Sequence, residues 1–221
     1  MADQQPELMA KFFSKRVDGY DSHMQNDVVG CRRGYLDMAA ALPAKVDTLL
    51  DLGVGTGLEL EPIFRRFPDV RVTGVDLCAD MLAECAKKYP GRKLTLIRED
   101  YTQVKLSAQA YDAAVSFQTL HHLNPTEKLS LFRKLYVALR VGGAYAQCDY
   151  FAADDAQEAA LRAQYDALRQ TEGYPNGERV HFDTPLTVEH ELALLRLAGF
   201  GDARMLWREG DTALLLAHRE H

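Results

Sequence analysis

The sequence predicts an α/β fold with a seven-stranded mixed sheet and helices on both faces. Three observations carry this prediction. Short apolar runs typical of strands alternate with longer amphipathic runs typical of helices. No internal repeat, low-complexity tract or linker divides the 221 residues, so we expect one domain over 1–221. The last two strand-like runs are joined by a tight stretch, which favours an antiparallel hairpin.

Seven runs have the composition of strands: residues 46–52, 70–76, 93–100, 111–117, 143–150, 203–209 and 212–219. The earlier runs are separated by segments long enough for helical crossovers, so we expect them to run parallel. The final run follows its neighbour after the turn "EGD" and should be antiparallel. The predicted sheet therefore has six parallel strands and a last strand that is antiparallel.

Helices are expected between the strands, at residues 57–67, 79–89, 125–140 and 187–198. The third has a clear start, because Asn124 can cap it, Pro125 suits the first helical turn and Glu127 completes a capping-box arrangement. The fourth should stop at Gly199, since glycine suits the left-handed conformation that ends many helices.

Composition limits the classes of partner. The formal charge of −6 and the absence of a basic run in the sequence disfavour nucleic acid. The amino-terminal stretch has no long apolar core, so we expect a cytoplasmic protein without a membrane partner. The cysteines have no metal-ligand spacing, so we expect no metal and reduced thiols at Cys31, Cys78, Cys85 and Cys148.

The stretch "TLLDLGVGTGLE", residues 48–59, concentrates three glycines after the first predicted strand. Their spacing at Gly53, Gly55 and Gly57 is G-x-G-x-G, whereas a dinucleotide site favours G-x-G-x-x-G. Asp51 precedes them at the carboxyl end of the strand, where it would repel a pyrophosphate and attract an ammonium group. The loop therefore favours a cationic ligand.

Two further acids end the next strands. Asp76 follows the third glycine by about 20 residues, where an acid can accept hydrogen bonds from ribose hydroxyls. Asp100 ends the third strand, where it can meet an adenine amino group. A ligand with an ammonium group, a ribose and an adenine but no phosphate is S-adenosylmethionine.

The motifs "LLDLGVGTG", "VTGVDLCADML", "LIREDYTQV" and "YDAAVSFQTLHHL" resemble, in order and spacing over residues 46–150, the cofactor motifs of class I S-adenosylmethionine-dependent methyltransferases. The lead-in "FFSKRVDGYDSHM" is similar to that of small-molecule members, whose Tyr-Asp pair, here Tyr20 and Asp21, covers the methionine end of the cofactor. The resemblance implies the sheet described above, with its last strand between two others. It assigns to the cofactor site Tyr20, Asp51, Gly53, Val54, Gly55, Thr56, Gly57, Asp76, Leu77, Met81, Asp100, Tyr101, Phe117 and Gln118.

Within this family the tail "EAALRAQYDALRQTEGY" and the "LAGF" crossover are most similar to the carboxy-S-adenosylmethionine synthase branch. That enzyme holds its extra carboxylate with an arginine, but the aligned position here is Leu194, and Arg196 is out of register. We therefore expect transfer of a plain methyl group. The alternatives are a synthase of an S-adenosylmethionine derivative, a non-catalytic module that binds S-adenosylmethionine, and an NAD(P)-dependent oxidoreductase, which the glycine spacing and Asp51 disfavour.

The remaining segments are expected to select the acceptor. Residues 46–150 would form the cofactor-binding core, and 187–221 the last helix and hairpin. Residues 1–40 and 150–186, rich in aromatic and polar side chains, would form helical lid segments over a small-molecule substrate. Turns are expected at Gly173, Pro175, Asn176 and Gly177. A homodimer is left open.

The sulfonium of the cofactor is already activated, so the enzyme chiefly aligns the reacting atoms. The candidate catalytic residues are His121 and His122, which follow the fourth strand at the edge where ligands bind in open α/β sheets. We expect only one of them to face the pocket, where it would act as a general base. The other interpretation is that both cap the strand end. Asp149 and Tyr150, after the fifth strand, are weaker candidates.

Overall fold

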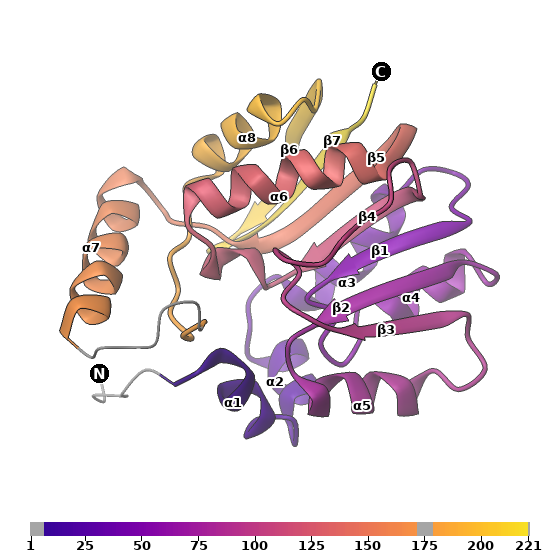
Figure 1. The fold of residues 1–221 in the computed structure, drawn as a ribbon, viewed down its shortest axis with the longest axis horizontal. Coiled ribbons are helices and arrows are strands. Elements are labelled where there is room, and N and C mark those ends of the chain that lie inside the picture. Colours follow the sequence, from indigo (N-terminus) through magenta and orange to yellow (C-terminus); the bar gives the residue numbers. More distant parts are fainter. Residues whose placement is uncertain (1–6, 172–178, 221) are drawn as a thin grey trace.

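The structure is a computed structural model that describes residues 7–171 and 179–220. Seven strands form one sheet in the order β3-β2-β1-β4-β5-β7-β6 (Figure 1). They are β1 (Thr48–Leu52), β2 (Arg71–Asp76), β3 (Leu94–Arg98), β4 (Tyr111–Phe117), β5 (Leu139–Tyr150), β6 (Asp202–Glu209) and β7 (Thr212–His218). Strand β7 pairs antiparallel with both β5 and β6, whereas the pairs from β3 to β5 are parallel. The predicted mixed sheet is confirmed, including the position of its last strand.

Helices cover both faces of the sheet. They are α1 (Met9–Ser14), α2 (Tyr20–Asn26), α3 (Cys31–Ala41), α4 (Leu60–Arg66), α5 (Ala79–Lys88), α6 (Pro125–Ala138), α7 (Asp155–Thr171) and α8 (Val188–Leu197). Buried side chains of α3, α4 and α5 pack with Leu49 on one face, and those of α6 and α8 pack with Leu50 on the other. Successive strand residues point to opposite faces of the sheet, so β1 contributes side chains to both hydrophobic cores.

The predicted start of α6 and the predicted end of α8 are found in the structure. The Asn124 side chain accepts a hydrogen bond from the Glu127 backbone, and the Glu127 carboxylate accepts one from the Asn124 backbone, so the capping box is complete. Gly199 follows α8 with φ +115°, as its predicted role as a helix stop requires. Strand β5 begins at Leu139, earlier than predicted, because Leu139 pairs with Tyr111 of β4.

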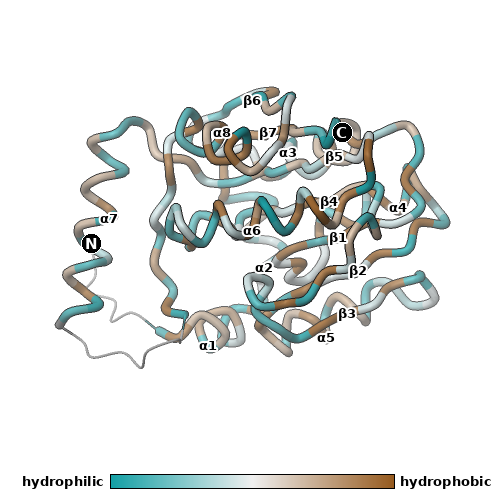
Figure 2. Tube along the Cα trace, turned by 45° about the horizontal axis from the view of Figure 1, so that its top comes forward, coloured by the Kyte–Doolittle hydropathy of each residue, from teal (hydrophilic) through white to brown (hydrophobic). Residues whose placement is uncertain are grey.

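The predicted lid segments lie only in part at the carboxyl edge of the sheet, because α3, in the first of them, packs on a face of the sheet. Helices α1 and α2 lie close to this edge, while α7 extends away from the sheet (Figure 1). Hydrophilic and hydrophobic positions alternate along α7 (Figure 2), as expected for a helix with one face in solvent. The predicted turn residues Gly173, Pro175, Asn176 and Gly177 lie outside the described residues.

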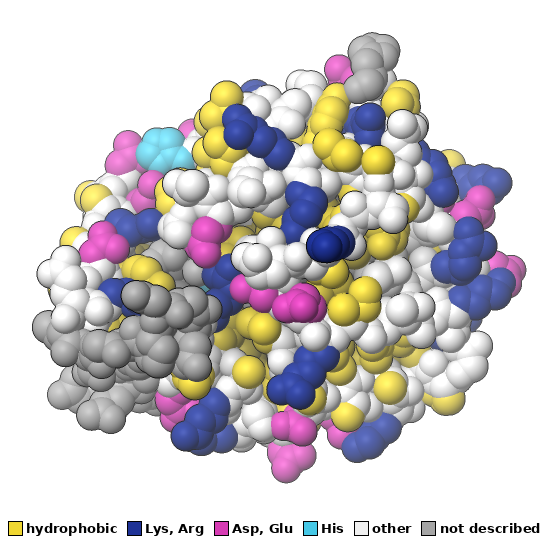
Figure 3. All heavy atoms as spheres, viewed as in Figure 1, with side chains coloured by type: hydrophobic (Ala, Val, Ile, Leu, Met, Phe, Trp, Pro, Cys, Tyr) yellow, Lys and Arg dark blue, Asp and Glu magenta, His cyan; other side chains and the backbone are white. Residues whose placement is uncertain are grey.

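The surface has a mixed character. On the face seen in Figure 3, acidic and basic side chains are interspersed with apolar ones. None of the helices in the described part of the chain is both long enough and apolar enough to cross a membrane.

Candidate functional site

The glycine loop after β1 has a left-handed backbone conformation, which residues other than glycine adopt only with strain. Gly53, Gly55 and Gly57 have φ angles of +72°, +49° and +76°. A side chain at Gly53 would collide with Thr119, so the loop packs tightly on that side. A Cβ at Gly55 would meet only the Gly53 carbonyl oxygen, at 3.9 Å. The backbone at Gly55 is therefore open to close approach by a ligand.

Two buried carboxylates lie at this loop. Asp51 is fully buried, and neither of its oxygens has a hydrogen-bond partner within residues 7–171 and 179–220. Glu59 is 4% exposed, and its Oε1 also lacks a partner there. Burial, followed by the neighbouring charge of Glu59, raises the pKa of Asp51 well above its ordinary value. Burial likewise raises the pKa of Glu59 to about 7. A cationic ligand group would relieve the cost of these unpaired acids.

Asp76, at the end of β2, holds the glycine loop. Its Oδ2 accepts a hydrogen bond from the Gly55 backbone at 2.9 Å, and its Oδ1 accepts one from Cys78 at 2.8 Å. Each carboxylate oxygen can accept a second bond, so Asp76 retains capacity for hydroxyl groups. Burial raises the pKa of Asp76.

All but two of the predicted cofactor residues line one narrow cleft. The cleft consists of two adjoining pockets that share Tyr20, Gly53, Gly55 and Phe117, and we call the two pockets together the cofactor cleft. The other predicted residues along it are Val54, Thr56, Gly57, Asp76, Leu77, Met81, Tyr101 and Gln118. Asp51 lies buried and does not line the cleft. Asp100 does not line it either, because its carboxylate accepts hydrogen bonds from Arg179 at 2.6 Å and from Thr102.

The amino-terminal helices cover the cofactor cleft. Met9, Ala10 and Phe13 of α1 line it together with Tyr20 of α2. Asp21 accepts a hydrogen bond from the Thr56 hydroxyl at 2.6 Å and pairs with Lys88, which fixes α2 on the glycine loop. The Tyr-Asp pair therefore lies over the loop.

A larger cavity of about 550 Å³ opens beside the cofactor cleft. The two share Phe13, Tyr20 and Gln118, and we call the larger one the outer cavity. Both His121 and His122 line it, so the expectation that only one of them faces the pocket is wrong. They lie in the 3₁₀ turn η1 (Leu120–His122), which does not alternate side chains between two faces as a strand does.

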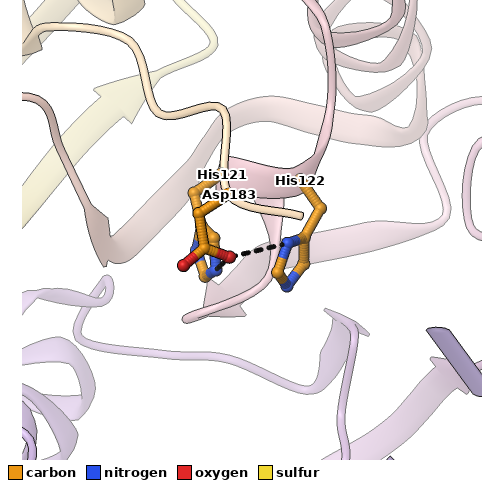
Figure 4. Close-up of side chains that lie close together, drawn as sticks. All are labelled: His121, His122 and Asp183. Atoms are coloured by element: carbon orange, nitrogen blue, oxygen red, sulfur yellow. Dashed lines mark ion pairs between the residues drawn. The ribbon is translucent and has the colours of Figure 1, made fainter. Parts of the chain in front are cut away.

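The two histidines meet an aspartate from the segment after α7. Asp183 Oδ1 lies 3.5 Å from Nε2 of His121 and 3.3 Å from Nδ1 of His122 (Figure 4). The Asp183 side chain is 43% exposed, yet its Oδ1 is buried and has no hydrogen bond of good geometry among the described residues. Its other oxygen therefore accounts for the exposure.

The histidines have different electrostatic surroundings. Asp149 Oδ1 lies 2.6 Å from Nδ1 of His121. Burial acts to lower the pKa of His121, but the charge of Asp149 outweighs it, so the pKa is raised. Burial lowers the pKa of His122. For Asp183, burial acts to raise the pKa, but the nearby imidazoles of His122 and His121 outweigh it, so the pKa is lowered.

A buried polar network fixes Asp149. Lys128 Nζ lies 2.7 Å from the Glu191 carboxylate, and Gln147 donates to the same carboxylate at 2.7 Å and to Asp149 at 3.3 Å. All four side chains are buried. The network joins α6, α8 and β5, and it holds the carboxylate that orients His121.

Sequence reasoning missed Glu59 and Asp183 as site residues, and it placed His181 only within the lid segment 150–186. The stretch "HFD", residues 181–183, carries two polar residues of the outer cavity in one short segment, which is the signal that could have indicated them. His181 stacks on Phe12 with ring centroids 3.5 Å apart.

Comparison with known proteins gives a consistent result. Residues 49–143 match the family model described as a methyltransferase domain. The demethylmenaquinone methyltransferase of Roseiflexus castenholzii is 30% identical over 146 residues, which are 65% of this chain and 60% of that protein. The carboxy-S-adenosyl-L-methionine synthase of Nautilia profundicola is 23% identical over 184 residues, covering 78% and 77% of the two chains.

The solved structures show the same fold. The structure of Haemonchus contortus phosphoethanolamine N-methyltransferase 2 in complex with S-adenosyl-L-methionine has a TM-score of 0.68 at 16% identity, over 94% of this chain and 57% of that one. The chain spans 60% of the length of the first curated relatives it matches. The fold of this solved structure and the match of residues 49–143 to the methyltransferase domain agree with the resemblance to class I methyltransferases.

Proposed function

We propose, from a chain whose residues 49–143 match the methyltransferase domain family, that this protein transfers a methyl group from S-adenosylmethionine to a small-molecule acceptor. Bound S-adenosylmethionine would supply an electrophilic methyl group on a sulfonium sulfur. The observation that carries the proposal is buried Asp51, whose two oxygens have no hydrogen-bond partner among the described residues, beside a glycine loop that is open at Gly55. A carboxylate pocket without phosphate-binding glycine spacing fits an ammonium group.

Each predicted cofactor residue then has a specific task. Asp51, with Glu59 beside it, attracts the ammonium group of the amino-acid end. Asp76 accepts hydrogen bonds from the ribose hydroxyls, for which its oxygens retain capacity. Tyr20 covers the methionine end, and Asp100 contacts the adenine amino group, which requires that Asp100 share its carboxylate with Arg179. The remaining residues that line the cleft pack around the cofactor and exclude water from it.

The outer cavity accommodates the acceptor. Its volume of about 550 Å³ lies within the range of small-molecule sites. His121 and His122 line it and are the candidate catalytic residues, in contact with the acceptor. The proposed division of one domain follows: residues 46–150 bind the cofactor, 1–40 and 150–186 select the acceptor, and 187–221 complete the sheet.

Two further features concern the setting of the protein. The four cysteines are all free and buried, which supports a reducing, cytoplasmic location. The net charge of −6 supports a small molecule rather than nucleic acid as the partner. A homodimer is supported by the edge strand β6, where Met205 and Leu206 are 44% and 40% exposed.

The alternative of a carboxy-S-adenosylmethionine synthase has less support. Arg196 donates a hydrogen bond to the Ala203 carbonyl at 2.7 Å, between α8 and β6, and lines neither the cofactor cleft nor the outer cavity. It is therefore engaged away from the site where an extra carboxylate would need it. This favours transfer of a plain methyl group.

The test begins with ligand binding. Thermal unfolding is measured with S-adenosylmethionine, S-adenosylhomocysteine, NAD and NADP, because a ligand at 100 times its dissociation constant stabilises a protein by about 2.7 kcal/mol. We expect stabilisation by the first two ligands only. Transfer of a labelled methyl group to a metabolite library then tests turnover. Stabilisation by NAD, or tight binding of S-adenosylmethionine without transfer to any acceptor, would favour one of the alternatives.

A further inference from the structure

A group of three metal-ligating side chains forms part of the wall of the outer cavity. His121 and His122 come from η1, and Asp183 comes from the segment that leads to α8 (Figure 4). One ligand atom from each of the three lies within 4.8 Å of the others. The methyl-transfer proposal does not require this convergence, since the residues that hold the cofactor lie in the neighbouring cleft.

The spacing of the three groups suits an ion. Zinc bonds to His nitrogen and carboxylate oxygen are about 2.0–2.2 Å long, so two ligand atoms at a tetrahedral angle lie about 3.3–3.6 Å apart. The Asp183 Oδ1 separations are 3.5 Å to His121 Nε2 and 3.3 Å to His122 Nδ1. Two of the three separations between ligand atoms therefore match those around a bound ion, and the third is at most 4.8 Å.

The polar surroundings also suit an ion. Asp149 engages Nδ1 of His121 and leaves Nε2 directed at Asp183, which is the arrangement that orients metal-binding histidines in proteins. Asp183 Oδ1 is buried without a good hydrogen bond among the described residues. The Phe182 carbonyl oxygen lies 3.2 Å from Nδ1 of His122 and can accept a hydrogen bond from it when no ion is bound.

We propose that His121, His122 and Asp183 bind one divalent transition-metal ion, with its open coordination positions facing the outer cavity. Two imidazoles and one carboxylate favour Zn²⁺, Fe²⁺ or Co²⁺ over Mg²⁺ and Ca²⁺, which prefer oxygen ligands. Three protein ligands leave at least one position free, which is typical of sites that contact a substrate. The inference goes beyond methyl transfer and departs from the expectation of no metal.

A second group in the described residues supplies a matched control. Asp155, Glu158 and His190 also converge, but His190 is half exposed at the surface and its Nδ1 is already bonded to Glu158 at 2.9 Å. This surface group touches neither cavity. A His190→Ala variant therefore removes an imidazole and any weak surface binding, while His121, His122 and Asp183 stay unchanged.

The experiment measures metal binding without cofactor or acceptor. Full-length protein is stripped with a chelator and titrated with Co²⁺ and Zn²⁺, with visible absorption of Co²⁺ and calorimetry as readouts. The variants are Asp183→Asn, His122→Ala, Asp149→Asn and His190→Ala. Asp183→Asn is nearly isosteric and half exposed, so we expect it to fold, and thermal unfolding of the metal-free variants checks this.

We expect one tight ion per chain in the wild type and in His190→Ala, with the visible absorption of a Co²⁺ site that has nitrogen ligands. Asp183→Asn and His122→Ala should lose that ion. Asp149→Asn should weaken binding by about 10- to 100-fold, because it removes the partner that orients His121. Wild-type affinity in folded Asp183→Asn, loss of binding only in His190→Ala, or no tight ion in the wild type would overturn the proposal. Because metal binding is measured without cofactor or acceptor, failure of this proposal is distinguishable from failure of the methyl-transfer proposal.

Discussion

Arg179 donates a hydrogen bond from Nε to Oδ2 of Asp100 at 2.6 Å, and its guanidinium lies 3.2 Å from the Glu127 carboxylate. This contact joins the segment that carries His181 and Asp183 to the region after β3 and to the start of α6. The wall of the outer cavity and the predicted adenine end of the cofactor cleft therefore share one ion pair.

The shared ion pair makes Asp100 a sharp test of the adenine assignment. Asp100→Asn should weaken the binding of S-adenosylhomocysteine and of adenosine alike, by about 1.5–3 kcal/mol, because both ligands carry the adenine amino group. Arg179→Ala is the matched control, since it removes the ion pair and leaves the carboxylate. Calorimetry with both ligands makes the comparison. If adenosine binds Asp100→Asn as it binds the wild type, Asp100 serves only to hold Arg179.

Asp76 should matter more than any other single cofactor residue. Asp76→Ala removes two charge-assisted bonds to the ribose, so binding should weaken by roughly 3–6 kcal/mol, or about 10²- to 10⁴-fold in dissociation constant. Glu84→Ala, an acid on the outer side of α5, is the control. Calorimetry with S-adenosylhomocysteine gives the affinities. Thermal unfolding of the ligand-free variants shows whether the protein with its glycine loop remains folded. Unchanged affinity in a folded Asp76→Ala protein would contradict the ribose assignment.

The cofactor cleft could be predicted because its determinants are local. Asp51, at the end of one strand, and the three glycines after it lie within seven residues of sequence, so strand, turn and charge can be read together. Asp76 needs only the parallel pairing of β1 and β2, which strand order and crossover length favour. Pairing of adjacent parallel strands brings their carboxyl ends to one edge, so these residues converge without any knowledge of loops.

The outer cavity could not be predicted in the same way. Asp183 lies about 60 residues from His121 in the sequence, in a segment with no periodic pattern, so its contact with His121 depends on where that segment packs. The orientation of both histidines depends on a three-residue 3₁₀ turn that alternation along a strand does not predict. Glu59 was missed because helix α4 begins only at Leu60, which leaves Glu59 in the loop against Asp51.

The histidines of the outer cavity should affect turnover rather than cofactor affinity. His122→Ala should lower methyl transfer by about 10²- to 10⁴-fold, the usual range for groups that assist proton transfer at a reacting atom. The dissociation constant of S-adenosylhomocysteine should stay within about twofold, because His122 does not line the cofactor cleft. His190→Ala is the control and should keep full activity. Wild-type rates in both His121→Ala and His122→Ala would remove these residues from the mechanism.

Helix α1 should respond to the cofactor. Met9, Ala10 and Phe13 line the cofactor cleft, and the Met9 backbone is hydrogen-bonded to the Arg179 carbonyl at 2.9 Å. A ligand that enters this narrow cleft must displace or reorder the helix, so amide exchange over residues 9–14 should change with S-adenosylhomocysteine. Amides of β1 and β4 are the internal reference. Identical exchange over residues 9–14 with and without ligand would mean that α1 is a fixed wall.

Glu59 should make cofactor affinity depend on pH. Burial raises its pKa to about 7, with the charge of Asp76 adding to the rise and the charge of Lys88 opposing it. An ammonium group favours the ionised carboxylate, so S-adenosylhomocysteine should bind more tightly as pH rises through 7, by at most about tenfold per unit. Adenosine has no ammonium group and should show little change. Calorimetry from about pH 5.5 to 8.5 measures both ligands.

The matched variant is Glu59→Gln, which should flatten the pH dependence of S-adenosylhomocysteine binding. The raised pKa of Glu59 also predicts how the stability of the ligand-free protein depends on pH. Because the pKa of Glu59 is raised from 4.5 to about 7 on folding, its contribution is fully present below 4.5 and is lost as pH rises towards 7. Thermal unfolding of wild type and Glu59→Gln should therefore diverge over this range, in favour of the variant at neutral pH. Parallel curves for the two proteins, or an equally steep pH dependence for adenosine, would contradict the assignment of Glu59 to the ammonium end of the cleft.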